Sequence, residues 1–358
     1  MFFSGLRAEG FRNLADIDIA FPEKFQCFLG ENGSGKTSVL EALYYLSHAK
    51  SFRTSSLKQL INHQADAFSL FSTFAGGVVP PKLGIRREQS GKQEMRFNGE
   101  RLTGISTVTQ QLPVQFLDTD AHRGLASSPS NRRRFLDWGV FHVEHGYATT
   151  WQTYQKVLKQ RNAMLKAGAG GAELRPWTEQ LIQLGVAMHE HRQQYMSAFL
   201  PVFEKVWQEL MEHLPLPIIS YYPGWRGSCF AEALMQAASQ DKRYGYTTVG
   251  PHRADITIVA QEVSVFDFFS QGQQKALTYA LKVAQGVFLQ QETGRSVVYL
   301  IDDLPAELDS IRLQAVFSVL EKHASQIFIT AIEMGVDWLA QQSAVGVFQV
   351  QDGVLKKT

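Results

Sequence analysis

The chain has 358 residues, enough for roughly two domains of ~150 residues each. Hydrophobic residues make up 44% and charged residues 19%, which excludes a largely disordered chain. Lys and Arg number 35 against 34 Asp and Glu, so the net charge of +1 excludes a uniformly basic protein but not a local basic surface.

The number of cysteines and the distribution of apolar residues indicate the cellular compartment in which the protein is expected to work. Cys27 and Cys229 are too few for a disulfide framework, so we expect a reducing, cytoplasmic environment. The first residues lack the apolar core of a signal peptide, and no stretch approaches ~18 uninterrupted apolar residues. The sequence therefore predicts no membrane span.

The first fifty residues have the pattern of strands followed by a helix. Residues 6–11 and 17–21 are expected to be short strands, and 25–29 is a compact apolar run that ends at Gly30. A helical apolar pattern follows over 37–49. The order is therefore strand, glycine-rich loop, helix.

The middle of the chain changes from strands to long helices. Turn signals across 68–105 predict antiparallel strands. A helix is expected over 151–165, and a second is expected to start near Pro176 and to kink at Pro201. These lengths predict a helical hairpin.

Strands and helices alternate again in the last third. The apolar runs 297–301 and 326–330, with helices between them, predict a parallel sheet. We therefore predict an α/β fold: a discontinuous head of residues 1–108 and 246–358 with an antiparallel β subdomain, and an inserted, mainly helical lobe of residues 109–245.

A phosphate-binding pattern follows the third predicted strand. It reads Gly30, Glu31, Asn32, Gly33, Ser34, Gly35, Lys36, Thr37, with Ser38 next. The glycines allow backbone N–H groups to point at phosphate oxygens, Lys36 can reach the β- and γ-phosphates, and Thr37 can place its hydroxyl on Mg²⁺. The pattern predicts bound ATP with Mg²⁺.

Two carboxylates end the strand at 297–301. Ligands bind at the carboxyl ends of parallel strands, so Asp302 is the predicted Mg²⁺ partner. Asp303 is placed to orient or activate the attacking water, or to hold the outer shell of the metal. Lys36, Asp302 and Asp303 are the predicted catalytic residues.

A second glycine motif lies 32 residues before Asp302. Ser270, Gly272 and Gln273 form a small, polar helix start, which is a second candidate anion site.

The order of phosphate loop, helical insert, Ser-x-Gly-Gln motif and acidic strand resembles the ATP-binding-cassette superfamily. Within it the chain is similar to the RecF family of bacterial DNA replication and repair proteins. The segments that carry this resemblance span nearly the whole length: 11–13, 30–37, 51–53, 132–137, 158–162, 250–255, 270–274, 301–303 and 307–309.

This resemblance implies a weak DNA-dependent ATPase that dimerises with ATP, the motif at Ser270 of one subunit capping the γ-phosphate held by the other. It implies binding to gapped DNA, or to single-stranded/double-stranded junctions, in recombinational gap repair, with RecR and RecO as partners in loading RecA. The chain departs from the family pattern at 117–120 and at Ala306–Glu307. Gln115 is the candidate for the glutamine that contacts the metal.

Basic residues concentrate between 121 and 166, where eight Lys and Arg face two acids. Such a segment can bind DNA phosphates without reading sequence. The candidate DNA contacts are Arg132, Arg133, Arg134, Lys159 and Arg161. Consecutive arginines cannot all point one way on a helix, so at least one is expected to be structural. Arg86–Arg87, Lys242–Arg243 and His252–Arg253 are further candidates.

Other functions remain open at this point. A P-loop phosphotransferase, or another cassette ATPase that does not act on DNA, would predict no stimulation by DNA. A transporter subunit would need a membrane partner, and a structural clamp with an inactive ATPase would not need Lys36, Asp302 and Asp303 intact.

Overall fold

The computed structural model describes residues 1–76, 79–117, 125–126, 128–303, 310–332 and 345–358. The chain forms two compact units, one of residues 1–121 with 279–358 and one of residues 122–278. Both bounds lie later in the chain than the predicted division at 109 and 245. The strand Val114–Leu117 pairs within the first unit, and the strand Asp255–Ala260 pairs within the second.

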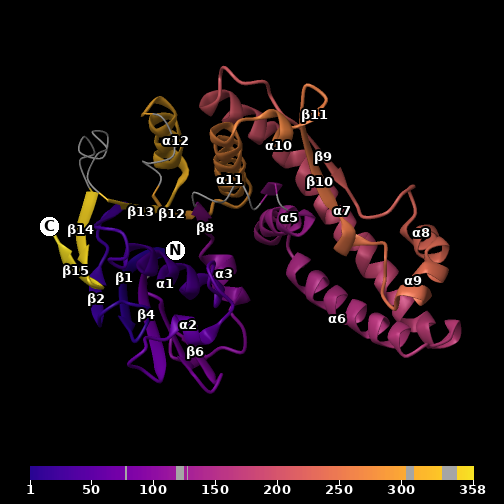
Figure 1. The fold of residues 1–358 in the computed structure, drawn as a ribbon, viewed down its shortest axis with the longest axis horizontal. Helices are drawn as coiled ribbons and strands as arrows, with labels where there is room; N and C mark the ends of the chain where they lie inside the picture. The colour runs from indigo at the N-terminus through magenta and orange to yellow at the C-terminus, as the bar shows by residue number, and fades with distance from the viewer. Residues whose placement is uncertain (77–78, 118–124, 127, 304–309, 333–344) are drawn as a thin grey trace. The chain divides into compact units, whose positions relative to one another are not determined.

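An antiparallel sheet forms one layer of the first unit, in the order β2-β1-β4-β5-β6-β7 (Figure 1). Its strands are β1 (Phe2–Glu9), β2 (Ile17–Ala20), β4 (Ala67–Ala75), β5 (Lys82–Glu88), β6 (Gln93–Phe97) and β7 (Glu100–Arg101). Asn98 and Gly99, which join β6 to β7, both have positive φ, as a tight hairpin turn requires. The predicted antiparallel strands between 68 and 105 are confirmed.

A mainly parallel sheet forms the other layer, in the order β15-β14-β3-β13-β12-β8. Its strands are β3 (Phe25–Leu29), β8 (Val114–Leu117), β12 (Val298–Ile301), β13 (Gln326–Ala331), β14 (Val345–Gln351) and the antiparallel edge strand β15 (Val354–Lys357). Every residue of β3, β12 and β13 is buried. Their continuous apolar runs reflect burial on both faces of the sheet.

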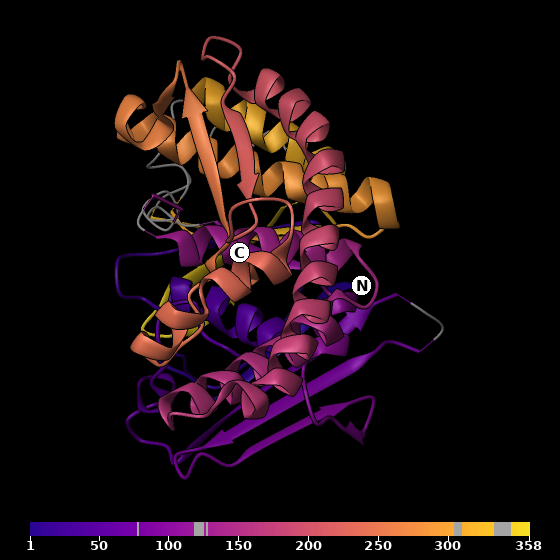
Figure 2. The same ribbon diagram turned by 90° about the vertical axis from the view of Figure 1, so that its right-hand side faces the viewer.

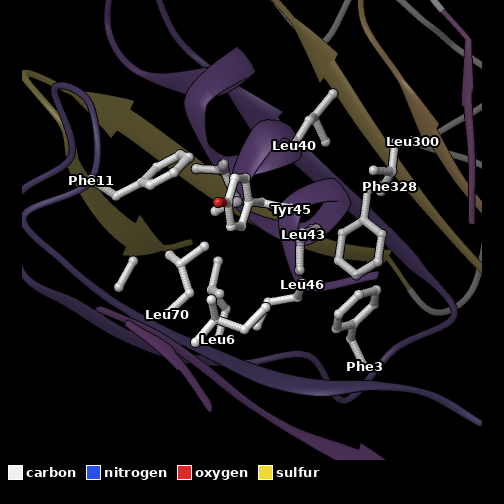
Figure 3. Close-up of a cluster of buried hydrophobic side chains, with 14 of the residues drawn as sticks. Phe3, Leu6, Phe11, Leu40, Leu43, Tyr45, Leu46, Leu70, Leu300 and Phe328 are labelled. Carbon is white, nitrogen blue, oxygen red and sulfur yellow. The ribbon is translucent and has the colours of Figure 1, made fainter. Parts of the chain in front are cut away.

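Helix α1 (Lys36–His48) is buried between these two sheets. Leu40, Leu43 and Leu46 recur every three residues and belong to one core cluster. That cluster also contains Phe3, Leu6 and Leu70 from the antiparallel sheet and Leu300 and Phe328 from the parallel sheet (Figure 3). Packing on both sides fixes the N-terminus of α1, where the phosphate loop ends. The short helices α2 (Leu57–Leu60) and α3 (Ser106–Gln111), and α12 (Ser310–His323), complete this unit.

Two long helices dominate the second unit. Helix α6 (Tyr147–Lys166) packs against α7 (Gly171–Leu210), as the predicted hairpin requires (Figures 1 and 2). Helix α7 begins five residues before the predicted start at Pro176 and continues through both Pro176 and Pro201. Glu173 accepts a hydrogen bond from the Gly170 amide at 2.8 Å, which caps this earlier start.

A small antiparallel sheet completes the second unit, in the order β11-β10-β9. The remaining elements are α5 (Pro129–Val143), β9 (Ile218–Tyr222), α8 (Phe230–Gln236), α9 (Ala238–Tyr244), the 3-10 turn η1 (Pro251–Arg253), β10 (Asp255–Ala260), β11 (Val263–Ser264) and α10 (Val265–Phe268). Helix α11 (Gln271–Thr293) contains the boundary between the units. The predicted α/β class, with its antiparallel sheet and helical insert, is confirmed.

Candidate functional site

The phosphate loop connects β3 to α1 within the first unit. Gly30, Gly33 and Gly35 all have positive φ, at 157°, 82° and 115°. A side chain at Gly30 would place its Cβ 2.2 Å from the carbonyl oxygen of Val350. Glycine is therefore required here both for the conformation and for the close approach of β14.

Lys36 lies inside this loop and is only 5% exposed. Its Nζ donates to the carbonyl oxygens of Gly30 at 2.7 Å and Glu31 at 3.0 Å. An ammonium group has three N–H donors, so two are used and one remains for a ligand. The loop holds the positive charge in position before any anion binds.

Asn13 braces the loop from the β1–β2 connection. Its Nδ2 donates to the Gly33 carbonyl at 3.0 Å, and its Oδ1 accepts from the Ser38 hydroxyl at 2.7 Å. The Ser34 carbonyl accepts from the Gly353 amide at 2.8 Å. Ser38, predicted as a ligand contact, therefore also has a structural partner.

The acidic strand end meets the phosphate loop through Thr37. The Thr37 hydroxyl donates to Asp302 Oδ1 at 3.1 Å, and the Thr330 hydroxyl donates to the same oxygen at 2.6 Å. The Asp303 amide in turn donates to Thr330 Oγ1 at 3.0 Å. Residues from the ends of α1, β12 and β13 thus form one connected polar cluster.

Burial dominates the electrostatics of this cluster. It raises the pKa of Asp302 above its usual value of 3.8, and the neighbouring Asp303 carboxylate acts in the same direction. Asp303 Oδ1 is buried without a hydrogen-bond partner, and Asp303 has a positive φ of 52°. Buried carboxylate oxygens without partners are costly, so this cluster suits a cation.

The donor set fits Mg²⁺. Magnesium is bound in proteins through one or two carboxylates together with phosphates and water, and here the Thr37 hydroxyl meets the Asp302 carboxylate with the charge of Asp303 nearby. Among the residues the structure describes, no group of three or more His, Cys, Asp or Glu side chains forms a closed metal cage.

A cavity of about 660 Å³ opens over the loop, within the range of small-molecule sites. Its lining residues are Arg12, Asn13, Asn32, Gly33, Gly35, Lys36, Thr37, Ser38, Arg53, Gln59, Ile61, Asn62, His63, Gln64 and Asp303. The lining therefore combines the phosphate loop and Asp303 with polar and basic side chains.

The Ser-x-Gly-Gln motif caps helix α11 in the second unit. The Gln273 amide donates to Ser270 Oγ at 3.3 Å, and Gln273 Oε1 accepts from the Ser270 amide at 2.9 Å. This reciprocal pair is a capping box. Space around Gly272 is open to 4 Å. The exposed Ser270 thus stands at a helix N-terminus, which favours anions.

Gln115 is not free to reach a ligand. It is 6% exposed on β8, and its Nε2 donates to Gln285 Oε1 at 3.1 Å. The departures from the family pattern at 118–120 and 306–307, and the acidic stretch through Asp309, lie outside the described residues.

The consecutive arginines on α5 have different environments. Arg132 forms a bidentate pair with Asp255, with Nε and Nη2 each 2.8 Å from a carboxylate oxygen. Arg133 Nη1 donates to the Ala254 carbonyl at 2.8 Å, whereas Arg134 is exposed and, within the described residues, donates to Asn131 Oδ1 at 3.2 Å. The expectation that at least one of the three is structural agrees with these contacts, and Arg134 is the freest of them.

The two candidates on α6 also differ. Lys159 is exposed, but Arg161 is 3% exposed and paired with Asp241 at 2.8 Å. Its Nη1 also donates to Thr247 Oγ1 at 2.6 Å. We correct the prediction for Arg161: a side chain buried in an ion pair cannot reach DNA.

Thr330 is the site residue that the sequence analysis missed. It is the penultimate residue of the buried strand β13, which lies between β3 and β12 in the sheet, and it contacts both aspartates. The feature of the sequence that could have identified Thr330 is a polar residue at the end of an apolar run. Asn13 was noticed only as part of the resemblance.

No helix in the described ranges is long and apolar enough to cross a membrane.

Comparison with known proteins identifies the family. Residues 2–356 match the RecF/RecN/SMC N terminal domain model. The DNA replication and repair protein RecF of Coxiella burnetii (strain Dugway 5J108-111) is 41% identical over 333 residues, covering 93% of this chain and 93% of its own. RecF of Actinobacillus pleuropneumoniae serotype 3 is 36% identical over 359 residues, covering 99% of each.

Solved structures establish the fold. A structure of the recombination mediator protein RecF with ATP, in the RecFOR pathway, matches with a TM-score of 0.88 at 23% identity, covering 100% of this chain and 99% of that one. The Smc head bound to the C-winged helix domain of ScpA matches at 0.60 and 17% identity, covering 100% and 97%. The expected likeness to ATPase heads of the cassette type is therefore confirmed. Because the family model spans nearly all of the chain and relatives named RecF are 36% and 41% identical over most of it, the chain belongs to the RecF/RecN/SMC N-terminal domain family and, within it, to the RecF group.

Proposed function

We propose that this chain is an ATP-dependent DNA-binding protein of recombinational gap repair and replication restart. It dimerises with ATP, hydrolyses ATP slowly under stimulation by DNA, and helps to load a recombinase on gapped single-stranded DNA. The observation that carries the proposal is the polar cluster in which Thr37, Asp302 and Thr330 meet beside Lys36. The names of the RecF relatives support the assignment to DNA replication and repair.

In this proposal the loop of residues 30–37 binds the ATP phosphates, and Lys36 donates its third N–H to the β- or γ-phosphate. Thr37 and Asp302 hold Mg²⁺, which when bound neutralises phosphate charge. Asp303 carries a buried carboxylate oxygen without a partner, and it orients the attacking water or the outer shell of the metal. Slow hydrolysis then serves release, so that the nucleotide state controls DNA binding.

The dimer in this proposal is held by ATP. Ser270, Gly272 and Gln273 of one subunit contact the γ-phosphate bound by the other. Ser270 is exposed and Gly272 has open space, so the motif is accessible to a phosphate. RecR and RecO are the proposed protein partners, supported by the RecFOR pathway named for the similar ATP-bound structures.

One experiment tests this function. ATPase rate and sedimentation are measured with and without ATP and gapped DNA, for the wild type, Lys36→Ala and the exposed control Lys58→Ala. Wild type and Lys58→Ala should dimerise only with ATP and hydrolyse it faster with DNA, and Lys36→Ala should do neither.

Unchanged sedimentation of the wild type on adding ATP would reject the dimer. A P-loop phosphotransferase, or a cassette ATPase that does not act on DNA, would instead show a rate that DNA leaves unaltered.

A further inference from the structure

An exposed ladder of arginine and tyrosine side chains lies in the second unit, outside the nucleotide site. The Tyr244 and Tyr246 rings stack with their centroids 5.8 Å apart and their planes 17° apart. Arg243 Cζ lies 5.9 Å from the centre of the Tyr244 ring, and Arg253 Cζ lies 5.4 Å from that of Tyr246. We call these four residues the Arg–Tyr ladder.

The ladder rests on a buried polar network. Asp241, in the middle of α9, pairs with Arg161 of α6 and accepts from the Thr248 amide and hydroxyl at 2.8 and 2.7 Å. Asn162 Oδ1 accepts from the Thr247 amide at 2.8 Å. The backbone on both sides of Tyr246 is therefore anchored to α6.

A second anchor holds the far end of the ladder. His252 Nδ1 lies 2.7 Å from the Tyr154 hydroxyl, and its Nε2 lies 3.0 Å from the Thr247 carbonyl oxygen. His252 directly precedes Arg253, so the partly buried histidine anchors the backbone from which that guanidinium extends. Residues 161–162 and 250–255, singled out in the sequence, thus build the base of the ladder.

The ladder is both accessible and positively charged. Tyr244 is 49% and Tyr246 39% exposed, and Lys242, Arg243 and Arg253 are exposed. No Asp or Glu occurs between 242 and 253. The adjacent Asp241 is fully buried and neutralised by Arg161, so it does not offset the cations.

We propose that the Arg–Tyr ladder binds single-stranded nucleic acid by stacking unpaired bases on Tyr244 and Tyr246. Exposed aromatic side chains beside arginines are the elements from which sequence-tolerant single-strand sites are built. The rings take the bases, and Lys242, Arg243 and Arg253 take the flanking phosphates. A duplex keeps its base faces stacked inside, and an acidic peptide has no such faces, so neither occupant would use the rings.

The inference rests on the proposed DNA binding and adds a site to it. The test measures affinity, by fluorescence anisotropy in the presence of ATP, for an oligothymidylate and for an abasic strand of the same length and charge. The variants are Tyr244→Ala/Tyr246→Ala, the aromatic replacement Tyr244→Phe/Tyr246→Phe, and the control Tyr222→Ala, whose side chain is 41% exposed elsewhere in the same unit. Thermal unfolding checks that each variant folds.

For each base that stacks on a removed ring, the double alanine variant should bind the oligothymidylate about 5-fold to 150-fold more weakly. Its affinity for the abasic strand should change little. The phenylalanine and Tyr222→Ala variants should bind both strands as the wild type does. Arg243→Ala should weaken both strands and reduce the salt slope by about 0.7.

The outcomes separate the two proposals. If the wild type binds DNA and the alanine variant binds the oligothymidylate equally well, the ladder is not a base-stacking site, although the proposed function stands. Equal losses on both strands, or a loss confined to duplex DNA or to an acidic peptide, would also overturn it. If the wild type binds no DNA at all, both proposals fail.

Discussion

Protonation of the partly buried His252 should destabilise the second unit in mild acid. Nε2 must carry a proton to donate to the Thr247 carbonyl, so Nδ1 of the neutral ring accepts from the Tyr154 hydroxyl. Burial, reinforced by the nearby Arg253 and Arg133, lowers the pKa of His252 to about 4. A second proton would remove the acceptor that Tyr154 uses.

The sign and size of this pH effect follow from the difference between the pKa of His252 in the folded and in the unfolded chain. The folded-state pKa lies below the ordinary value of about 6.5, so the unfolded chain binds more protons in acid. The contribution of neutral His252 to the free energy of unfolding is therefore fully present above pH 6.5 and is lost as the pH falls toward 4. Between pH 7 and pH 5 it amounts to about 2 kcal/mol of the free energy of unfolding.

Urea unfolding followed by tryptophan fluorescence measures this effect. Five of the six tryptophans lie in residues 122–278, so the signal reports mainly the second unit. The wild type is compared with His252→Gln, which keeps a donor and an acceptor but does not titrate. The wild type should lose about 2 kcal/mol more than the variant between pH 7 and pH 5. Parallel curves for the two proteins would refute the reasoning.

Five further substitutions, at four positions, test the site and the basic residues. Asp303→Asn should keep ATP binding but slow hydrolysis and prolong the dimer; normal turnover in a steady-state assay would remove Asp303 from its role. Ser270→Arg should bind nucleotide yet fail to dimerise with ATP in sedimentation, whereas Ser270→Ala should cost about 0.5–2 kcal/mol of stability through the lost cap. Arg161→Met leaves Asp241 buried without its partner and should cost about 3–5 kcal/mol, whereas Lys159→Ala should alter stability by less than about 0.5 kcal/mol and weaken DNA binding. A stable Arg161→Met variant with reduced DNA affinity would show that our correction is mistaken.

The phosphate loop and the acidic strand end could be predicted because their determinants are local. The run 25–29, the spacing of Gly30, Gly33 and Gly35, and the helix after them are adjacent in the sequence. Thr330 could not be assigned in this way, because its role depends on β13 lying between β3 and β12. Chain order does not give strand order in a sheet.

The start of α7 illustrates a second limit. Proline favours the first turn of a helix, so Pro176 predicted the start, yet the helix begins at Gly171. Glu173 caps the earlier start. Phe199, Phe203 and Trp207 are buried on either side of Pro201, so packing maintains the helix where a backbone hydrogen bond is missing.

The basic residues divide into two classes that a charge count cannot separate. Arg132 and Arg161 are neutralised by Asp255 and Asp241, which lie outside the counted segment 121–166. The exposed cations of that segment, among the residues described, are Arg134, Lys156, Lys159 and Lys166. Because only exposed cations release counterions from DNA, they and the Arg–Tyr ladder should set the salt dependence of binding. Arg132 and Arg161, held in ion pairs, maintain the shape of the surface. They can therefore be indispensable for DNA binding without contacting DNA.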